Sequence, residues 1–118
     1  MFKRERMQRE IRRLLAEWFL LEVRDSRIKD MTVTRCEVTK DGKYAKVFVI
    51  SHASLEENEK MVKHINEKMR GFARKYLAEH LNARVVPEIR FYYDKGIDAS
   101  IEMQKKFEEL GLEEDEES

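Results

Sequence analysis

A long amphipathic helix with a glycine inside it is the feature that most limits the folds open to this chain. The helix is expected to begin after Ser54, where Glu57 three residues later completes a capping box, and to end near Leu81. Gly71 lies inside it, although glycine in a helix interior costs about 1 kcal/mol relative to alanine. The sequence therefore predicts one helix kinked at Gly71, because the apolar period continues through the glycine, at Met61, Val62, Ile65, Met69, Phe72, Ala73, Tyr76, Leu77 and Leu81.

Shorter elements precede and follow this helix. The segment Lys40-Asp41-Gly42-Lys43 contains an Asp-Gly pair, which favours a tight turn between antiparallel strands. Between Val33 and Cys36 the apolar pattern changes parity, which indicates a bulge or a frayed strand start. Pro87 donates no ladder hydrogen bond, so it is expected near the start of a third strand. The sequence thus predicts an α+β fold in the order α-β-β-α(kink)α-β, with a three-stranded sheet and helices packed on one face, the first helix at 4–22 and the strands at 31–39, 44–51 and 85–93.

The formal net charge of zero conceals a division of the chain. Residues 1–95 hold 22 Lys and Arg against 15 Asp and Glu, whereas residues 96–118 hold 2 against 9. We expect a single folded domain at 1–95, followed by a weakly amphipathic helical segment at 97–110 and an acidic, disordered tail. A basic body attracts polyanions such as RNA, although its charges could also form an ordinary solvated surface. The tail is either a solubilising end or a segment that folds back on the basic body and weakens non-specific RNA binding.

The sequence offers no constellation for catalysis. His52, His64 and His80 lack the spacing of metal ligands, and no glycine-rich phosphate loop is present, so no cofactor is expected. Cys36 is the single cysteine, and we interpret it as a buried structural thiol rather than a nucleophile. The sequence contains no run of 18 apolar residues, so it predicts no membrane span. A non-enzymatic, cytoplasmic protein is the expectation.

Three segments together resemble the bacterial ribosome-binding factor A family, over about residues 1–95. They are Arg6-Met7-Gln8-Arg9-Glu10-Ile11, Ala45-Lys46-Val47-Phe48-Val49, and Val86-Pro87-Glu88-Ile89-Arg90-Phe91 with Asp94 after it. The resemblance implies a type-II KH-like domain in which an Ala-x-Gly kink replaces the Gly-x-x-Gly loop. The corresponding segment here is Met69-Arg70-Gly71, which keeps the glycine but has methionine in place of alanine, and Met69 also fits the inward apolar stripe.

The resemblance also implies a function. Members of this family are non-enzymatic factors for late maturation of the small ribosomal subunit. They bind free 30S subunits at the neck, near the 5′-terminal helix and the decoding region of 16S rRNA, and promote processing of the 16S precursor, most of all in the cold. Maturation GTPases of the same pathway are implied as functional partners, and a monomer is expected. The alternative is a protein-interaction α/β module without direct RNA contact.

Three groups of residues are candidates for RNA contact, each with a structural alternative. Cations at the kink could neutralise a phosphate brought close by the missing side chain of Gly71, or they could form a solvated helix face. Arginines on the first helix could form a phosphate-facing stripe, or they could pair within the helix. Cations in the connector after that helix are placed similarly. The candidates are Arg6, Arg9, Arg12, Arg13, Arg24, Arg27, Lys29, Lys68, Arg70, Gly71, Arg74 and Lys75.

Aromatic residues could stack on unpaired bases or belong to the core. Trp18, Phe91 and Tyr93 are expected in the core, whereas Phe19 and Tyr92 stay open to either role.

Overall fold

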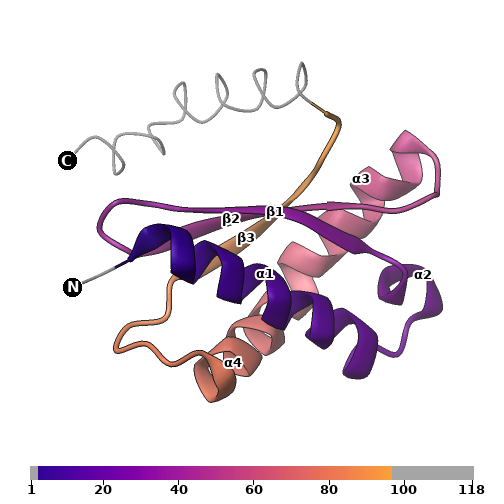
Figure 1. Ribbon diagram of the computed structural model, residues 1–118. Helices are drawn as coiled ribbons and strands as arrows, with labels where there is room; N and C mark the ends of the chain where they lie inside the picture. The colour runs from indigo at the N-terminus through magenta and orange to yellow at the C-terminus, as the bar shows by residue number, and fades with distance from the viewer. Residues whose placement is uncertain (1–2, 97–118) are drawn as a thin grey trace.

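The computed structural model describes residues 3–96, and in these the helices lie on one side of a three-stranded sheet (Figure 1). The central strand β2 pairs antiparallel with β1 and parallel with β3, so the helices between β2 and β3 form a crossover. This arrangement confirms the predicted α+β class with helices on one face. The elements are α1 (Arg4–Leu21), α2 (Ser26–Lys29), β1 (Thr32–Val38), β2 (Tyr44–Ile50), α3 (Leu55–His64), the π-helical turn η1 (Ile65–Met69), α4 (Arg70–His80) and β3 (Glu88–Tyr93).

Local signals in the sequence are confirmed at several positions. The register of β1 against β2 shifts between Val33 and Arg35, which is the expected bulge. Gly42 adopts a φ of 76° in the turn between these strands, a conformation that glycine accepts without strain. Ser54 caps α3, since its hydroxyl accepts a hydrogen bond from the Glu57 N–H at 3.2 Å. Pro87 directly precedes β3, where its missing N–H disrupts no ladder.

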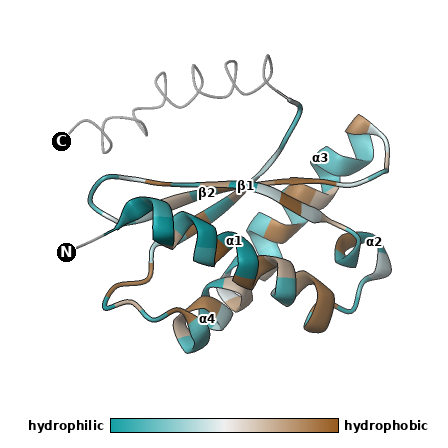
Figure 2. Ribbon diagram, viewed as in Figure 1, coloured by the Kyte–Doolittle hydropathy of each residue, from teal (hydrophilic) through white to brown (hydrophobic). Residues whose placement is uncertain are grey.

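The core lies between the sheet and the helices and is centred on three aromatic rings. The rings of Trp18 and Phe19 lie 4.9 Å apart, and that of Phe19 lies 5.9 Å from Phe91. All three residues are buried, so Phe19 belongs to the core and cannot stack on a base. Figure 2 shows hydrophobic residues, in brown, along the later turns of α1, while its first turns are hydrophilic and teal. Burial of such rings dominates the stability of a small core.

Some local expectations differ from the structure. The connector after α1 contains the short helix α2, whose N-cap Asp25 accepts a hydrogen bond from the Arg27 N–H at 3.0 Å. Phe72 was expected on the inward apolar face of the long helix, but 68 % of its surface is exposed. The end of the long helix agrees with the expectation, since His80 is its last residue and Leu81 its C-cap. The predicted segment 97–110 and the acidic tail lie outside the described residues.

One buried polar side chain fixes the connection from β2 to α3. Asn58 is fully buried, and its Oδ1 accepts hydrogen bonds from the Ser51 N–H at 3.0 Å and the Ser51 hydroxyl at 2.9 Å. Its Nδ2 donates to the carbonyl oxygens of Ala53 and Ser54 at 2.9 and 3.0 Å. Both polar atoms of the buried Asn58 amide therefore have partners, and these hydrogen bonds hold the loop between β2 and α3 in place. Within the described part of the chain, no helix is both long and apolar enough to cross a membrane.

Candidate nucleic-acid interface

The kink in the crossover helix is a π-helical turn attached to the sheet. This turn, η1, ends two residues before Gly71, so the irregularity precedes the glycine. Asn66 within it bonds to both backbone groups of Phe91, donating to the carbonyl oxygen and accepting from the N–H, each at 2.8 Å. The amide thereby pairs with the edge of β3 as a neighbouring strand would. The wider π-helical turn η1, which the Asn66 side chain attaches to β3, thus sets the direction of α4.

Gly71 lies on the outer surface immediately after this turn. A Cβ built at Gly71 would meet no atom within 4 Å, so close packing does not require the glycine. Its φ is not positive either, so backbone conformation does not require it. Among the described residues, no strand or helix packs closely enough on Gly71 to require a glycine there. The bare helix surface at Gly71 leaves room for a ligand to approach the backbone.

Cations and an exposed ring surround this bare surface. Phe72 and Lys75 lie three residues apart in α4 and so share one side of that helix, and Lys68 lies in the π-helical turn just before them. A cavity of about 280 Å³ adjoins them between the end of α1 and α4, and Phe72, Lys75 and Arg24 contribute to its wall. Trp18, Met69 and Tyr76 also line it, and Met69 packs against the core as its apolar character indicated. We call the group Arg24, Lys68, Arg70, Gly71, Phe72 and Lys75 the kink surface.

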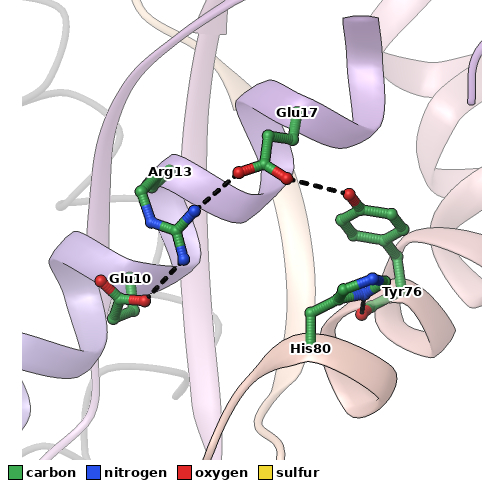
Figure 3. A network of polar contacts seen from close by, with 5 residues as sticks. All are labelled: Glu10, Arg13, Glu17, Tyr76 and His80. Carbon is green, nitrogen blue, oxygen red and sulfur yellow. Dashed lines mark hydrogen bonds and ion pairs between the residues drawn. The ribbon is translucent and has the colours of Figure 1, made fainter. Parts of the chain in front are cut away.

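A second polar group joins α1 to α4 and uses one of the candidate arginines. Arg13 donates to Glu10 at 2.9 Å and to Glu17 at 2.6 Å, and the Tyr76 hydroxyl donates to Glu17 at 3.1 Å (Figure 3). The hydrogen bond from Arg13 holds the pKa of Glu10 below its usual value. Burial, and to a smaller extent the hydrogen bond to Glu17, raises the pKa of Tyr76. His80 completes the group by stacking on Tyr76, with ring centroids 4.1 Å apart. Arg13 is therefore paired with two carboxylates of its own helix, and one of these, Glu17, contacts α4 through Tyr76.

The remaining candidate cations divide by their partners. Arg74 donates to the carbonyl oxygens of Val86 and Pro87 at 3.0 and 3.3 Å, so it fastens α4 to the chain before β3. Arg27 pairs with Asp25 at 3.5 Å. The other candidates form no hydrogen bond or ion pair with another described residue: Arg6, Arg9, Arg12, Arg24, Lys29, Lys68, Arg70 and Lys75. Arg6 and Arg9 lie close enough to Glu10 to contribute, after the hydrogen bond from Arg13, to its lowered pKa, whereas the charges of the other six are available to an external anion.

The structure brings some of these cations together and separates others. Arg24 and Lys75 line the same cavity, although they are far apart in sequence. Glu22, the C-cap of α1, lines the same cavity. Arg9 lies 13 residues before it, which is roughly 20 Å along the helix at a rise of about 1.5 Å per residue. The arginines near the start of α1 therefore form a second, separate basic area. Two basic areas at this spacing suit an extended polyanion better than a small one.

The described residues contain no group of three or more His, Cys, Asp and Glu side chains that could hold a metal ion. Burial raises the pKa of the Cys36 thiol to about 12, so the thiolate needed for nucleophilic chemistry is disfavoured at neutral pH. The chemistry that the kink surface does offer is anion binding and stacking. Phe72 was missed as a functional candidate because its sequence spacing placed it in the inward stripe, and no local signal marks it as exposed.

We expect Gly71→Ala to separate stability from binding. Alanine fits the open position, so the free energy of unfolding should rise by about 0.5–1 kcal/mol. The added methyl should weaken RNA binding because it occupies the surface that a phosphate or ribose would approach. Chemical denaturation and filter binding measure the two effects. Ala78→Gly, at an exposed position of α4, is the matched control and should lower stability without changing RNA affinity. Unchanged binding by Gly71→Ala would exclude contact at the glycine.

The fold and the kink surface together define a KH-like α+β domain with an open kink in place of a glycine-rich loop. The sequence profile of the family described as ribosome-binding factor A matches residues 3–107. The chain belongs to the ribosome-binding factor A family. The match extends past residue 95, and the division of the chain at that residue stays a prediction.

Individual relatives agree with this membership. Ribosome-binding factor A of Thermotoga maritima is 38 % identical over 112 residues, which cover 93 % of this chain and 84 % of the relative. The solution structure of a Thermotoga maritima protein described as a putative ribosome binding factor A matches with a TM-score of 0.64 at 38 % identity, over 80 % of this chain and 89 % of that one. A homology model of the Thermus thermophilus factor, fitted into the cryo-EM map of a 30S complex, shares the fold with a TM-score of 0.60 at 22 % identity, over 77 % and 93 % of the two chains.

Proposed function

We propose that this chain is a cytoplasmic, non-enzymatic factor that binds free 30S ribosomal subunits through 16S rRNA and promotes late maturation, including processing of the 16S precursor. Family membership supports the ribosome-binding role, and the Thermus relative with the same fold has been fitted into a 30S complex. A functional link to maturation GTPases, a monomeric state and a greater need in the cold belong to the same proposal.

The observation that carries the proposal is the open glycine among unpaired cations. Neither the backbone conformation nor the packing of the described fold requires a glycine at position 71. Around it, Lys68, Arg70 and Lys75 form no ion pair with an acidic side chain of the described residues. A phosphate backbone fits both features, because it approaches closely and neutralises several cations at once. Phe72 adds an exposed ring on which an unpaired base can stack.

Co-sedimentation of the full chain with separated ribosomal particles, at two salt concentrations, tests the proposal. We expect co-migration with free 30S subunits but not with 50S subunits or assembled 70S ribosomes. The affinity should fall steeply with salt, by roughly 0.7–0.9 in log K per log unit of salt for each phosphate contacted. Absence of any subunit preference at both salt concentrations would refute 30S binding. Salt-insensitive self-association in the ultracentrifuge would instead favour the protein-interaction module.

Charge reversal should localise the contact. Lys68→Glu and Arg70→Glu are each expected to weaken 30S binding and to reduce the salt slope by about one phosphate contact. Arg9→Glu tests the separate basic area on α1 in the same way. Lys40→Glu, which makes the same change of charge at an exposed position in the turn between β1 and β2, is the control. Equal losses in all four variants would show a non-specific effect of net charge and would contradict binding at the kink surface.

A further inference from the structure

The face of the sheet opposite the helices carries two cross-strand rows of side chains. On β2 the alternate residues Ala45, Val47 and Val49 belong to the core with the helices, whereas Phe48 does not. The described helices all lie on the other side of the sheet (Figure 1). The register places three side chains in each row across the strands. The rows form what we call the outer sheet face: Arg35, Phe48 and Tyr92 in one, and Glu37, Lys46 and Arg90 in the other.

The outer sheet face has an aromatic centre and a cationic surround. The Arg35 guanidinium lies 4.1 Å from the centre of the Phe48 ring, and the ring of Tyr92 lies 5.8 Å from it on the other side. Glu37 is the one carboxylate in the two rows and lies 3.6 Å from Arg35. The two rows thus hold three cations against one carboxylate, and Asp94 directly after β3 is a second carboxylate that interacts with Arg35. A segment with an apolar side and acidic flanks complements both properties.

Burial on this face requires a cover. Phe48 is only 3 % exposed and Lys46 only 8 % exposed, although no helix in the described part of the chain lies over them. Lysine is among the residues least often buried in folded proteins. Neighbours within the same rows flank the Phe48 ring from its sides. A further segment lying across the strands accounts for the low exposure of both residues.

Residues 97–118 have the composition and the position for this role. They carry two Lys against nine Asp and Glu, with apolar residues at Ile97, Ile101, Phe107 and Leu110. After β3 the Asp94 side chain accepts a hydrogen bond from the Gly96 N–H at 2.9 Å, and Gly96 adopts a φ of 101°. The described chain there leaves the sheet on the side opposite the helices (Figure 1).

The length of this segment is also sufficient. Arg90 lies six residues before Gly96, which is roughly 20 Å along a strand. Residues 97–110 would span roughly 21 Å as a helix. A segment that turns back at Gly96 therefore reaches both rows of the outer sheet face.

We propose that the acidic C-terminal segment 97–118 packs against the outer sheet face of its own chain, with its apolar residues on Phe48 and Tyr92 and its carboxylates near Arg35, Lys46 and Arg90. The tail then covers the sheet and leaves the kink surface free. This inference does not depend on the proposed function, because it concerns the side of the molecule opposite the kink.

Paramagnetic relaxation enhancement on the full chain tests the packing. A nitroxide is attached to Lys106→Cys, a position opposite Ile97 and Ile101 in the helical period, while Cys36 resists labelling because it is buried. We expect the amide signals of Lys46 and Arg90 to lose intensity and to recover when the label is reduced. The amide of Lys75 in α4 should keep its intensity. Rising salt should weaken the effect because acidic and basic groups contribute to the contact.

Two variants and one mixed sample make the outcome decisive. Tyr92→Ser should reduce the attenuation, whereas Phe72→Ser, which removes an exposed ring on the helical side, should not. The core amides of Val47 and Ile89 report that each variant is folded. Attenuation at the kink surface, or none beyond residues 93–96, would overturn the proposal. Equal attenuation in a mixture of spin-labelled and isotope-labelled chains would show a second copy as the occupant and would also overturn it.

Discussion

Replacement of Asn58 by alanine is expected to lower the free energy of unfolding by about 3 kcal/mol, measured by urea denaturation. The amide is fully buried and bonds to the Ser51 N–H, the Ser51 hydroxyl and two carbonyl oxygens of the β2–α3 connection. Alanine would remove all four hydrogen bonds of this buried side chain, and a group left unsatisfied at a buried site costs about 1–3 kcal/mol. Since a domain of this size is stable by about 5–15 kcal/mol, the loss would be a large fraction of the total.

Asn82→Ala is the matched control for this substitution. Asn82 is exposed and follows the C-cap of α4, so the same chemical change there should alter stability by less than about 0.5 kcal/mol. A loss by Asn58→Ala no greater than that of the control would mean that water replaces the amide in the loop. The role assigned to Asn58 would then be wrong.

Asn66→Ala is expected to cost about 2 kcal/mol of stability and to weaken RNA binding as well. Its side chain makes two hydrogen bonds, both of 2.8 Å, to the backbone of Phe91 and so connects the π-helical turn to β3. Without them the turn can revert to a regular helix, and that change would rotate Lys68 relative to Lys75 at the kink surface. Denaturation and 30S binding of one preparation give both quantities.

Comparison with Gly71→Ala separates the two contributions of the kink. The Gly71 variant should bind less while becoming more stable, whereas the Asn66 variant should lose both properties. Asn66→Asp is an intermediate case, because it keeps the acceptor for the Phe91 N–H but places a carboxylate against the Phe91 carbonyl oxygen. Normal 30S binding by a destabilised Asn66→Ala variant would show that the position of α4 does not matter for the contact.

The candidate site was predictable only in part. The basic residues at the kink and Gly71 were selected from the sequence. Whether a given cation is free to bind an external anion, however, depends on partners that are distant in the sequence. Glu17, beside Arg13, also accepts a hydrogen bond from Tyr76, 59 residues away in sequence, and Arg74 bonds to the chain 12 and 13 residues later. Spacing along one helix cannot reveal such partners. Phe72 was assigned to the core for a related reason, since a continuous period was assumed through the kink.

The sequence by itself determined the elements of this protein and their order. Apolar periodicity located the helices and strands, and turn and cap chemistry located the hairpin at Gly42, the bulge after Val33 and the N-cap at Ser54, because these signals act within a few residues. The sequence also placed Ala73, Tyr76, Leu77 and Leu81 correctly in the core, but only the tertiary structure decided that Phe72 is exposed. A π-helical turn adds a residue to the period and rotates everything after it by about 100°. That rotation, held by Asn66 against a strand 25 residues later, turns Phe72 outward beside Gly71.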